Sequence, residues 1–190
     1  MKRLFDIVGS LIAMVVFAIP IAVIYVLIRL EDHGPAIFSQ ERIGRKGKPF
    51  RLYKFRSMIV NAEKNGKPQL FEADDERLTK VGRFLRAHHL DEFPQLWNIL
   101  KGDMSFVGYR PERQYFIDQI MKHNPRYEEL YKIRPGIFSK ATLYNGYTDT
   151  MEKMLIRLEM DLEYLENVSL GYDLKIIWLT SYSILTGKNF

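Results

Sequence analysis

Two adjacent carboxylates, Asp91 and Glu92, stand between a basic segment and a run of apolar residues at helical spacing. The segment reads Arg-Ala-His-His-Leu-Asp-Glu-Phe-Pro-Gln from Arg86 to Gln95, which puts Pro94 in the first turn of the expected helix. An acid at that place is favoured as an N-cap, because its oxygens accept hydrogen bonds from the first backbone N–H groups. Spacing alone favours this structural role.

A catalytic role would need the same geometry. Helix N-termini bind phosphates, and neighbouring residues share no helix face, so only a turn or a helix start lets both carboxylates address one site. One carboxylate, ionised in water with a pKa near ~3.9, could attack phosphorus without a base. The other could hold a metal ion or take a proton. The pair is therefore a candidate site for phosphoryl transfer.

Basic residues that could hold phosphate occur at three separated places. Lys54 ends a short aromatic-rich segment, Arg86 precedes Asp91 by five residues, and Arg110 lies in Gly-Tyr-Arg-Pro, where its planar fork could bind a diphosphate. Any one of them could equally be a solvated surface charge. His88 and His89 lack a third metal ligand at useful spacing, so we expect structural or surface roles for them.

The pattern around these residues predicts a mostly helical α/β domain. Residues 37–43 and 50–55 alternate as a β-hairpin around a turn rich in Gly and Lys, and 61–77 is expected to be a mobile or solvated loop. Helices are predicted over 93–100, 114–121, 151–165 and 174–185. The stripe from Met151 to Leu165 is typical of core packing, whereas the last helix could lie in the core or at a membrane interface.

A separate element begins the chain. Residues 7–28 are almost wholly apolar, long enough for a helix to cross a bilayer core of ~30 Å, and Pro20 lies within them. A signal peptide is disfavoured, because the run is long and no small-residue cleavage site follows it. Both flanks are basic, which a helix hairpin bent at Pro20 and returning to the cytoplasmic face would satisfy. A single span with a tolerated proline stays open on these grounds.

The composition fits an enzyme of phosphorylated substrates or a binder of acidic partners. The net charge is +5, the pI is about 9.3, and the absence of cysteine excludes disulfides and thiolate zinc sites. A membrane-anchored protein that holds nucleic acid or anionic lipid through charge alone is the rival interpretation. A carboxylate pair among separated cations argues against that interpretation, since an electrostatic binder needs no such pair.

Taken together, these motifs resemble the bacterial sugar transferase family, the monotopic phosphoglycosyl transferases that start glycan assembly on undecaprenyl phosphate. The resemblance covers nearly the whole chain. It rests on ordered stretches: Lys-Arg-Leu-Phe-Asp-Ile-Val-Gly at 2–9, Phe-Ser-Gln-Glu-Arg-Ile-Gly at 38–44, Tyr-Lys-Phe-Arg-Ser-Met at 53–58, 86–95, Leu-Lys-Gly-Asp-Met-Ser-Phe-Val-Gly-Tyr-Arg-Pro at 100–111, Arg-Pro-Gly-Ile at 134–137 and Asp-Leu-Lys at 173–175.

The resemblance implies a re-entrant membrane helix over residues 1–30, kinked at Pro20, and a cytoplasmic, interface-associated catalytic domain over 31–190. It implies that Asp91 attacks the β-phosphorus of a UDP-sugar, releasing UMP, and that undecaprenyl phosphate then takes the phosphosugar. Glu92 matches the second carboxylate of the dyad, and Mg²⁺ is implied at Asp91 and Glu92. Lys54, Arg86 and Arg110 match basic positions of the family's active site.

The resemblance also implies partners and a location. The partners are a UDP-sugar, undecaprenyl phosphate and anionic lipids, without nucleic acid, at the cytoplasmic face of the bacterial inner membrane. The sugar, the glycan pathway and the oligomeric state, a homodimer included, stay open. The chain departs from the family at Ile19-Pro20, where many members have Ser-Pro, and at Tyr147, where many have Arg. Recognition of sugar or uridine by residues 136–147 cannot be carried over.

Overall fold

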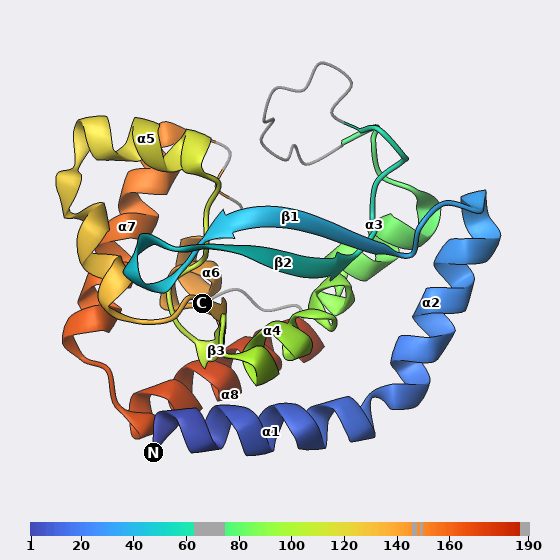
Figure 1. Cartoon of the computed structure of the whole chain (residues 1–190), viewed down its shortest axis with the longest axis horizontal. Helices are drawn as coiled ribbons and strands as arrows, with labels where there is room; N and C mark the ends of the chain where they lie inside the picture. The colour runs from blue at the N-terminus through green and yellow to red at the C-terminus, as the bar shows by residue number, and fades with distance from the viewer. Residues whose placement is uncertain (63–74, 146–147, 149, 187–190) are drawn as a thin grey trace.

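A computed structural model describes residues 1–62, 75–145, 148 and 150–186, and in them it shows a mostly helical α/β fold with two short sheets (Figure 1). This confirms the predicted fold class. Most of the loop expected over residues 61–77 lies outside the described residues. The division into 1–30 and 31–190 stays a prediction.

The chain begins with a bent pair of helices, α1 (Lys2–Val16) and α2 (Ala18–Asp32), which meet at 63°. The break falls at Phe17 and not at Pro20 itself. Proline has no N–H to donate to the carbonyl of the fourth residue before it, here Val16, so α1 ends there and Pro20 sits in the first turn of α2. Within the described residues no single helix is long and apolar enough to cross a bilayer, whereas the bent pair together meets that test.

Helix α1 turns its polar residues toward the protein. The buried Asp6 carboxylate accepts hydrogen bonds from the Ser105 hydroxyl (2.9 Å) and the Phe106 N–H (3.1 Å). Arg3 donates to the carbonyls of Ile99 and Leu100, at the end of another helix. The outward-facing residues are large and apolar: Leu4, Val8, Leu11, Ile12 and Val15. The helix therefore presents an apolar face to its surroundings.

The predicted hairpin is confirmed as β1 (Ile37–Ile43) paired antiparallel with β2 (Pro49–Phe55). Its turn holds Lys46 and Gly47 at positive φ, which suits the glycine. The base of the hairpin is tied to α2, because Arg56 donates to Asp32 and to the carbonyl of Pro35. Arg56, 6% exposed, is thus a buried structural residue.

Three short helical elements follow the hairpin: α3 (Lys80–Ala87), the 3₁₀ turn η2 (Leu90–Glu92) and α4 (Gln95–Lys101). Thr79 caps α3 by accepting from the Gly82 N–H at 2.9 Å, and Gly102 ends α4 in the left-handed conformation, as Lys-Gly predicts. Asn98 on α4 fixes this run to β2, since its side chain accepts from the Tyr53 N–H and donates to the Arg51 carbonyl.

The rest of the chain packs around a second, parallel pair of strands that the sequence did not predict, β3 (Ser105–Val107) and β4 (Gly136–Phe138). Between them lie α5 (Gln114–His123) and η3 (Pro125–Lys132), and α6 (Lys140–Asn145), α7 (Met151–Glu166) and α8 (Leu170–Thr186) follow. The α7 stripe is core, as predicted: Met154, Leu158 and Leu162 are each 2% exposed.

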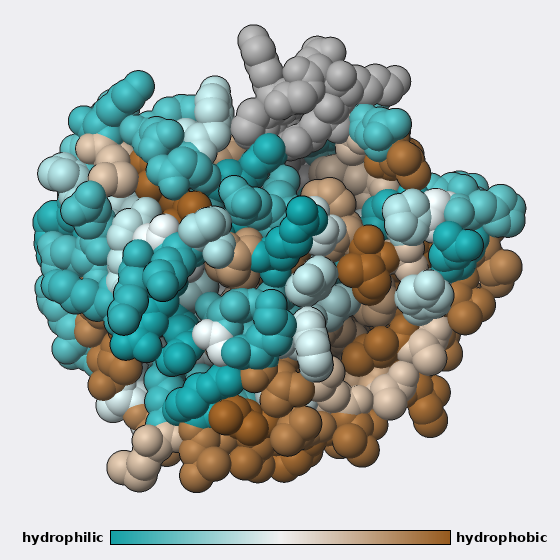
Figure 2. All heavy atoms as spheres, viewed as in Figure 1, coloured by the Kyte–Doolittle hydropathy of each residue, from teal (hydrophilic) through white to brown (hydrophobic). Residues whose placement is uncertain are grey.

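Helix α8, for which the sequence left open a place in the core or at a membrane interface, has one buried face and one exposed face. Asp173, Ile176 and Thr180 are buried, while Leu174, Trp178 and Tyr182 form an exposed stripe one turn apart. In the space-filling view, apolar residues gather along the edge formed by α1 and α2, and polar residues cover the opposite part (Figure 2).

Candidate active site

A cavity of about 380 Å³ brings together all five residues that the sequence singled out for chemistry: Lys54, Arg86, Asp91, Glu92 and Arg110. They come from three separate parts of the chain: β2, the adjacent elements α3 and η2, and the connection after β3. The far wall is formed by α6, α7 and α8, with Thr142, Tyr144, Arg157 and Thr180 among its residues. The volume suits a small polar ligand.

The carboxylate pair occupies a tight turn and not a helix cap. His89 adopts the left-handed conformation (φ 55°), which ends α3 and starts the 3₁₀ turn that carries Asp91 and Glu92. The N-cap positions of η2 and α4 are His89 and Pro94. The structural role that spacing favoured is therefore wrong, and both carboxylates, 4% and 7% exposed, line the cavity.

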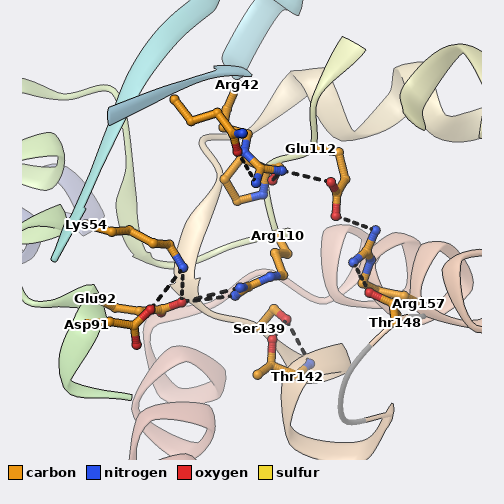
Figure 3. A network of polar contacts seen from close by, with 12 residues as sticks. Arg42, Lys54, Asp91, Glu92, Arg110, Glu112, Ser139, Thr142, Thr148 and Arg157 are labelled. Atoms are coloured by element: carbon orange, nitrogen blue, oxygen red, sulfur yellow. Dashed lines mark hydrogen bonds and ion pairs between the residues drawn. The ribbon is translucent and has the colours of Figure 1, made fainter. Parts of the chain in front are cut away.

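Lys54 lies between the two carboxylates. Its ammonium Nζ is 2.6 Å from Glu92 Oε1 and 3.8 Å from Asp91 Oδ2 (Figure 3). Arg110 approaches the same Glu92 oxygen at 3.4 Å through both terminal nitrogens. Glu92 is thus held by two cations, while Asp91 has only the more distant contact with Lys54.

This asymmetry separates the two carboxylates in acidity. Burial alone would raise the pKa of Glu92, but the attraction of Lys54 and Arg110 outweighs it and lowers this pKa to about 2. Burial raises the pKa of Asp91 above its ordinary value, although Lys54 and Arg86 oppose the rise. Asp91 is therefore less acidic than a carboxyl group in water, and its charge depends on its cationic neighbours.

Asp91 and Glu92 fit the Mg²⁺ that the family resemblance implied, provided that substrate phosphates complete the coordination of the ion. Mg²⁺ is usually held through one or two carboxylates together with substrate phosphates and water. Asp91 and Glu92 offer that number of carboxylates side by side. Within the part of the chain that the structure describes, no three His, Cys, Asp or Glu side chains cluster as a metal site.

Among the cavity residues that sequence reasoning did not assign to the site are His89 and Arg157. His89, expected to be structural or at the surface, lines it, and burial lowers the pKa of its imidazole. Arg157 lies on α7, within a helix that the sequence assigned to the core. The sequence signal that could have identified Arg157 is its pairing with Asp161, one helical turn away, since both residues lie next to the apolar stripe of the helix.

Comparison with known proteins agrees with this arrangement. The model of the family described as "Bacterial sugar transferase" matches residues 1–187. The chain is 41% identical over 186 residues to a UDP-N-acetylgalactosamine-undecaprenyl-phosphate N-acetylgalactosaminephosphotransferase of Aeromonas hydrophila, covering 98% of this chain and 44% of that protein. It is 40% identical over 190 residues to a UDP-glucose:undecaprenyl-phosphate glucose-1-phosphate transferase of Caulobacter vibrioides, covering 99% and 71%.

A third relative, the exopolysaccharide production protein PSS of Rhizobium leguminosarum, is 38% identical over 197 residues, covering 100% of this chain and 98% of its own length. By contrast, the chain spans less than half of the Aeromonas protein and of a Klebsiella pneumoniae glucose-1-phosphate transferase, 44% and 41%. The family match and these identities extend over the dyad and over the cationic residues of the cavity. The chain belongs to the bacterial sugar transferase family.

Proposed function

We propose that the chain transfers a sugar-1-phosphate from a UDP-sugar to undecaprenyl phosphate, through a covalent intermediate on Asp91. The observation that carries this proposal is the asymmetric dyad: one buried carboxylate is locked by two cations, and its neighbour is left with a single ammonium at 3.8 Å. A nucleophile must not be consumed by a tight ion pair, and Asp91 meets that condition better than Glu92. The charges of Lys54 and Arg86 favour its ionised form against burial. The relatives' names supply the substrate classes.

The first half-reaction begins when Asp91 Oδ attacks the β-phosphorus of the donor. The bond between that phosphorus and the bridging oxygen breaks, its electron pair leaves with UMP, and a phosphosugar ester of Asp91 remains. Lys54, Arg86 and Arg110 offset the repulsion between the carboxylate and the diphosphate. A bound Mg²⁺, held by the dyad and the phosphates, would polarise the transferring phosphoryl group.

In the second half-reaction an oxygen of the lipid phosphate attacks the same phosphorus and displaces the Asp91 carboxylate. The incoming phosphate meets the same repulsion, so one set of cations serves both steps. Glu92 keeps Lys54 and Arg110 oriented throughout, because its low pKa leaves it ionised. Because UMP leaves before the lipid phosphate reacts with the covalent intermediate, this mechanism predicts ping-pong kinetics.

The membrane placement is part of the proposal. The apolar face of α1, the bent pair and the exposed stripe of α8 support a re-entrant insertion, in which the break at Phe17 returns the chain to the cytoplasmic face of the inner membrane. The polar side of α1 is already satisfied by Ser105, Phe106 and the carbonyls of α4, so only the apolar side faces lipid. Anionic lipids and Mg²⁺ remain proposed partners.

The rival function, electrostatic binding of nucleic acid or lipid, fits the structure less well. Four cationic side chains, each at most 20% exposed, contact a carboxylate within 4 Å: Arg42, Lys54, Arg56 and Arg157. An electrostatic binder keeps its cations free to face phosphates. This basic sequence instead builds an internal polar network.

A panel of UDP-sugars tests the proposal. The purified chain, with Mg²⁺ and undecaprenyl phosphate, should release UMP from one or a few donors, and Asp91→Asn should abolish that release. Asp118→Asn, the same change at an exposed carboxylate of α5, is the matched control and should be active. Release that survives Asp91→Asn at the control's rate would exclude Asp91 as the nucleophile.

A further inference from the structure

The cavity contains a buried guanidinium that the mechanism above does not use. Arg157 of α7 is 5% exposed and lines the same cavity as the dyad. One terminal nitrogen is 2.8 Å from Glu112 Oε1, and the other donates to the Thr148 hydroxyl at 2.6 Å (Figure 3). The two contacts differ in kind, because the first is an ion pair and the second a bond to a neutral acceptor.

Glu112 holds Arg157 in a fixed relation to Arg110. Its second carboxylate oxygen accepts from Arg42 at 2.9 Å, and its backbone carbonyl accepts from the Ile43 N–H at 3.0 Å. Glu112 follows Arg110 by two residues, and Arg42 also donates to the intervening carbonyl of Pro111. The end of β1 therefore anchors the connection that carries Arg110, and the same carboxylate orients Arg157.

The positive charge of Arg157 is only partly neutralised by the carboxylates around it, which favours binding of an anion. Glu112 is shared between Arg42 and Arg157, so one carboxylate faces two guanidiniums. Asp161, one turn along α7, is buried, and burial raises its pKa to about 7, which limits how far it neutralises Arg157. Lys54 and Arg110 are already engaged with the dyad. The second contact of Arg157 is to a neutral hydroxyl, which a phosphate oxygen could replace, since charge-assisted bonds are stronger than neutral ones.

We propose that Arg157 binds the phosphate that departs with the nucleotide, exchanging the Thr148 hydroxyl for a phosphate oxygen while Glu112 keeps its other nitrogen in place. Glu112 is then a positioning residue. This inference rests on the proposed function and assigns a residue to its leaving group. A phosphate on Arg157 would also explain why the ion pair with Glu112 is kept buried at the cavity wall, where an apolar pair would otherwise serve.

Binding of UMP and of uridine, measured by calorimetry on the purified full chain with Mg²⁺, tests the proposal. Uridine lacks the phosphate and reports on the rest of the nucleotide site. Arg157→Lys keeps a charge but cannot serve Glu112 and a phosphate together, so UMP should bind about tenfold more weakly while uridine binding is unchanged. Arg126→Lys, at an exposed arginine in η3, is the matched control and should bind both as the wild type does.

A second variant distinguishes phosphate binding by Arg157 from a purely structural role of its contact with Thr148. Thr148→Val removes the neutral acceptor and leaves one nitrogen of Arg157 without it in the free protein, so UMP should bind as tightly as before or more tightly. Weaker UMP binding in Thr148→Val, equal losses for UMP and uridine in Arg157→Lys, or unchanged UMP binding in Arg157→Lys would each overturn the assignment. Wild-type protein that binds UMP yet releases none from any UDP-sugar would instead count against the proposed function alone.

Discussion

Replacing Lys54 by Met should shift the acidic limb of the pH–rate profile upward. The ammonium lies 3.8 Å from Asp91 Oδ2, and two unit charges at that distance interact by about 4 kcal/mol at an effective dielectric constant of ~20. That energy corresponds to about 3 pKa units, and relaxation and water entry will reduce it. Burial already raises the pKa of Asp91, so the loss of the cation raises it further and leaves a smaller fraction of the nucleophile ionised at a given pH.

Initial rates of UMP release between pH 5 and 9.5 measure this effect. In Lys54→Met the limb should move up by roughly one to three pH units, in addition to any fall in the plateau rate. Lys54→Arg, which keeps the charge, should hold the limb close to that of the wild type. A lower plateau with an unmoved limb in Lys54→Met would show that Lys54 binds phosphate without setting the ionisation of Asp91, and the reasoning would be refuted.

Three further predictions concern the scaffold. Pro20→Ala supplies an N–H at residue 20 that can donate to the Val16 carbonyl, so α1 and α2 should straighten. Single cysteines placed on the two flanks of this cysteine-free chain should then label from opposite sides of the membrane instead of one. Gly82→Ala should destabilise folding by about 3 kcal/mol or more in chemical denaturation, because its Cβ would lie 1.9 Å from the Ser57 carbonyl oxygen; a neutral effect would contradict this packing. Asp161 has a pKa of about 7 in the folded protein and 3.8 in the unfolded chain, so the folded state loses stability as the pH rises between these values. The melting temperature of Asp161→Asn, relative to that of the wild type, should therefore increase from pH 5 to pH 8. A difference in melting temperature that does not grow with pH would refute the raised pKa of Asp161.

The sequence predicted the hairpin, α4, α5 and α7 well, because each is long enough to show its period or ends at clear Gly or Pro positions. It missed β3 and β4, since strands of three residues show no alternation and their parallel pairing depends on the close approach of Gly108 and Gly136. It placed the bend at Pro20 although the break falls at Phe17, because the effect of a proline is felt by the carbonyl four residues earlier.

The candidate site was predicted in its members but not in its electrostatics. Motif resemblance identified Lys54, Asp91, Glu92 and Arg110, and the structure brings them together. That Glu92 contacts two cations, while the ion pair of Asp91 with Lys54 is longer, depends on a 3₁₀ turn after a left-handed His89, which no local pattern predicts. Arg157 was missed because a charge in an amphipathic helix looks like a surface residue, and its burial involves contacts with Glu112 and Thr148 from outside α7.

Trapping the intermediate tests the central claim most directly. Intact-protein mass spectrometry of the chain, incubated with Mg²⁺ and an active UDP-sugar but without lipid, should show one added phosphosugar that peptide mapping places on Asp91. The adduct should disappear when undecaprenyl phosphate is added, and it should be absent from Asp91→Asn. An unmodified protein that still turns over with lipid, through sequential kinetics in which both substrates bind first, would mean direct attack by the lipid phosphate and would contradict the account.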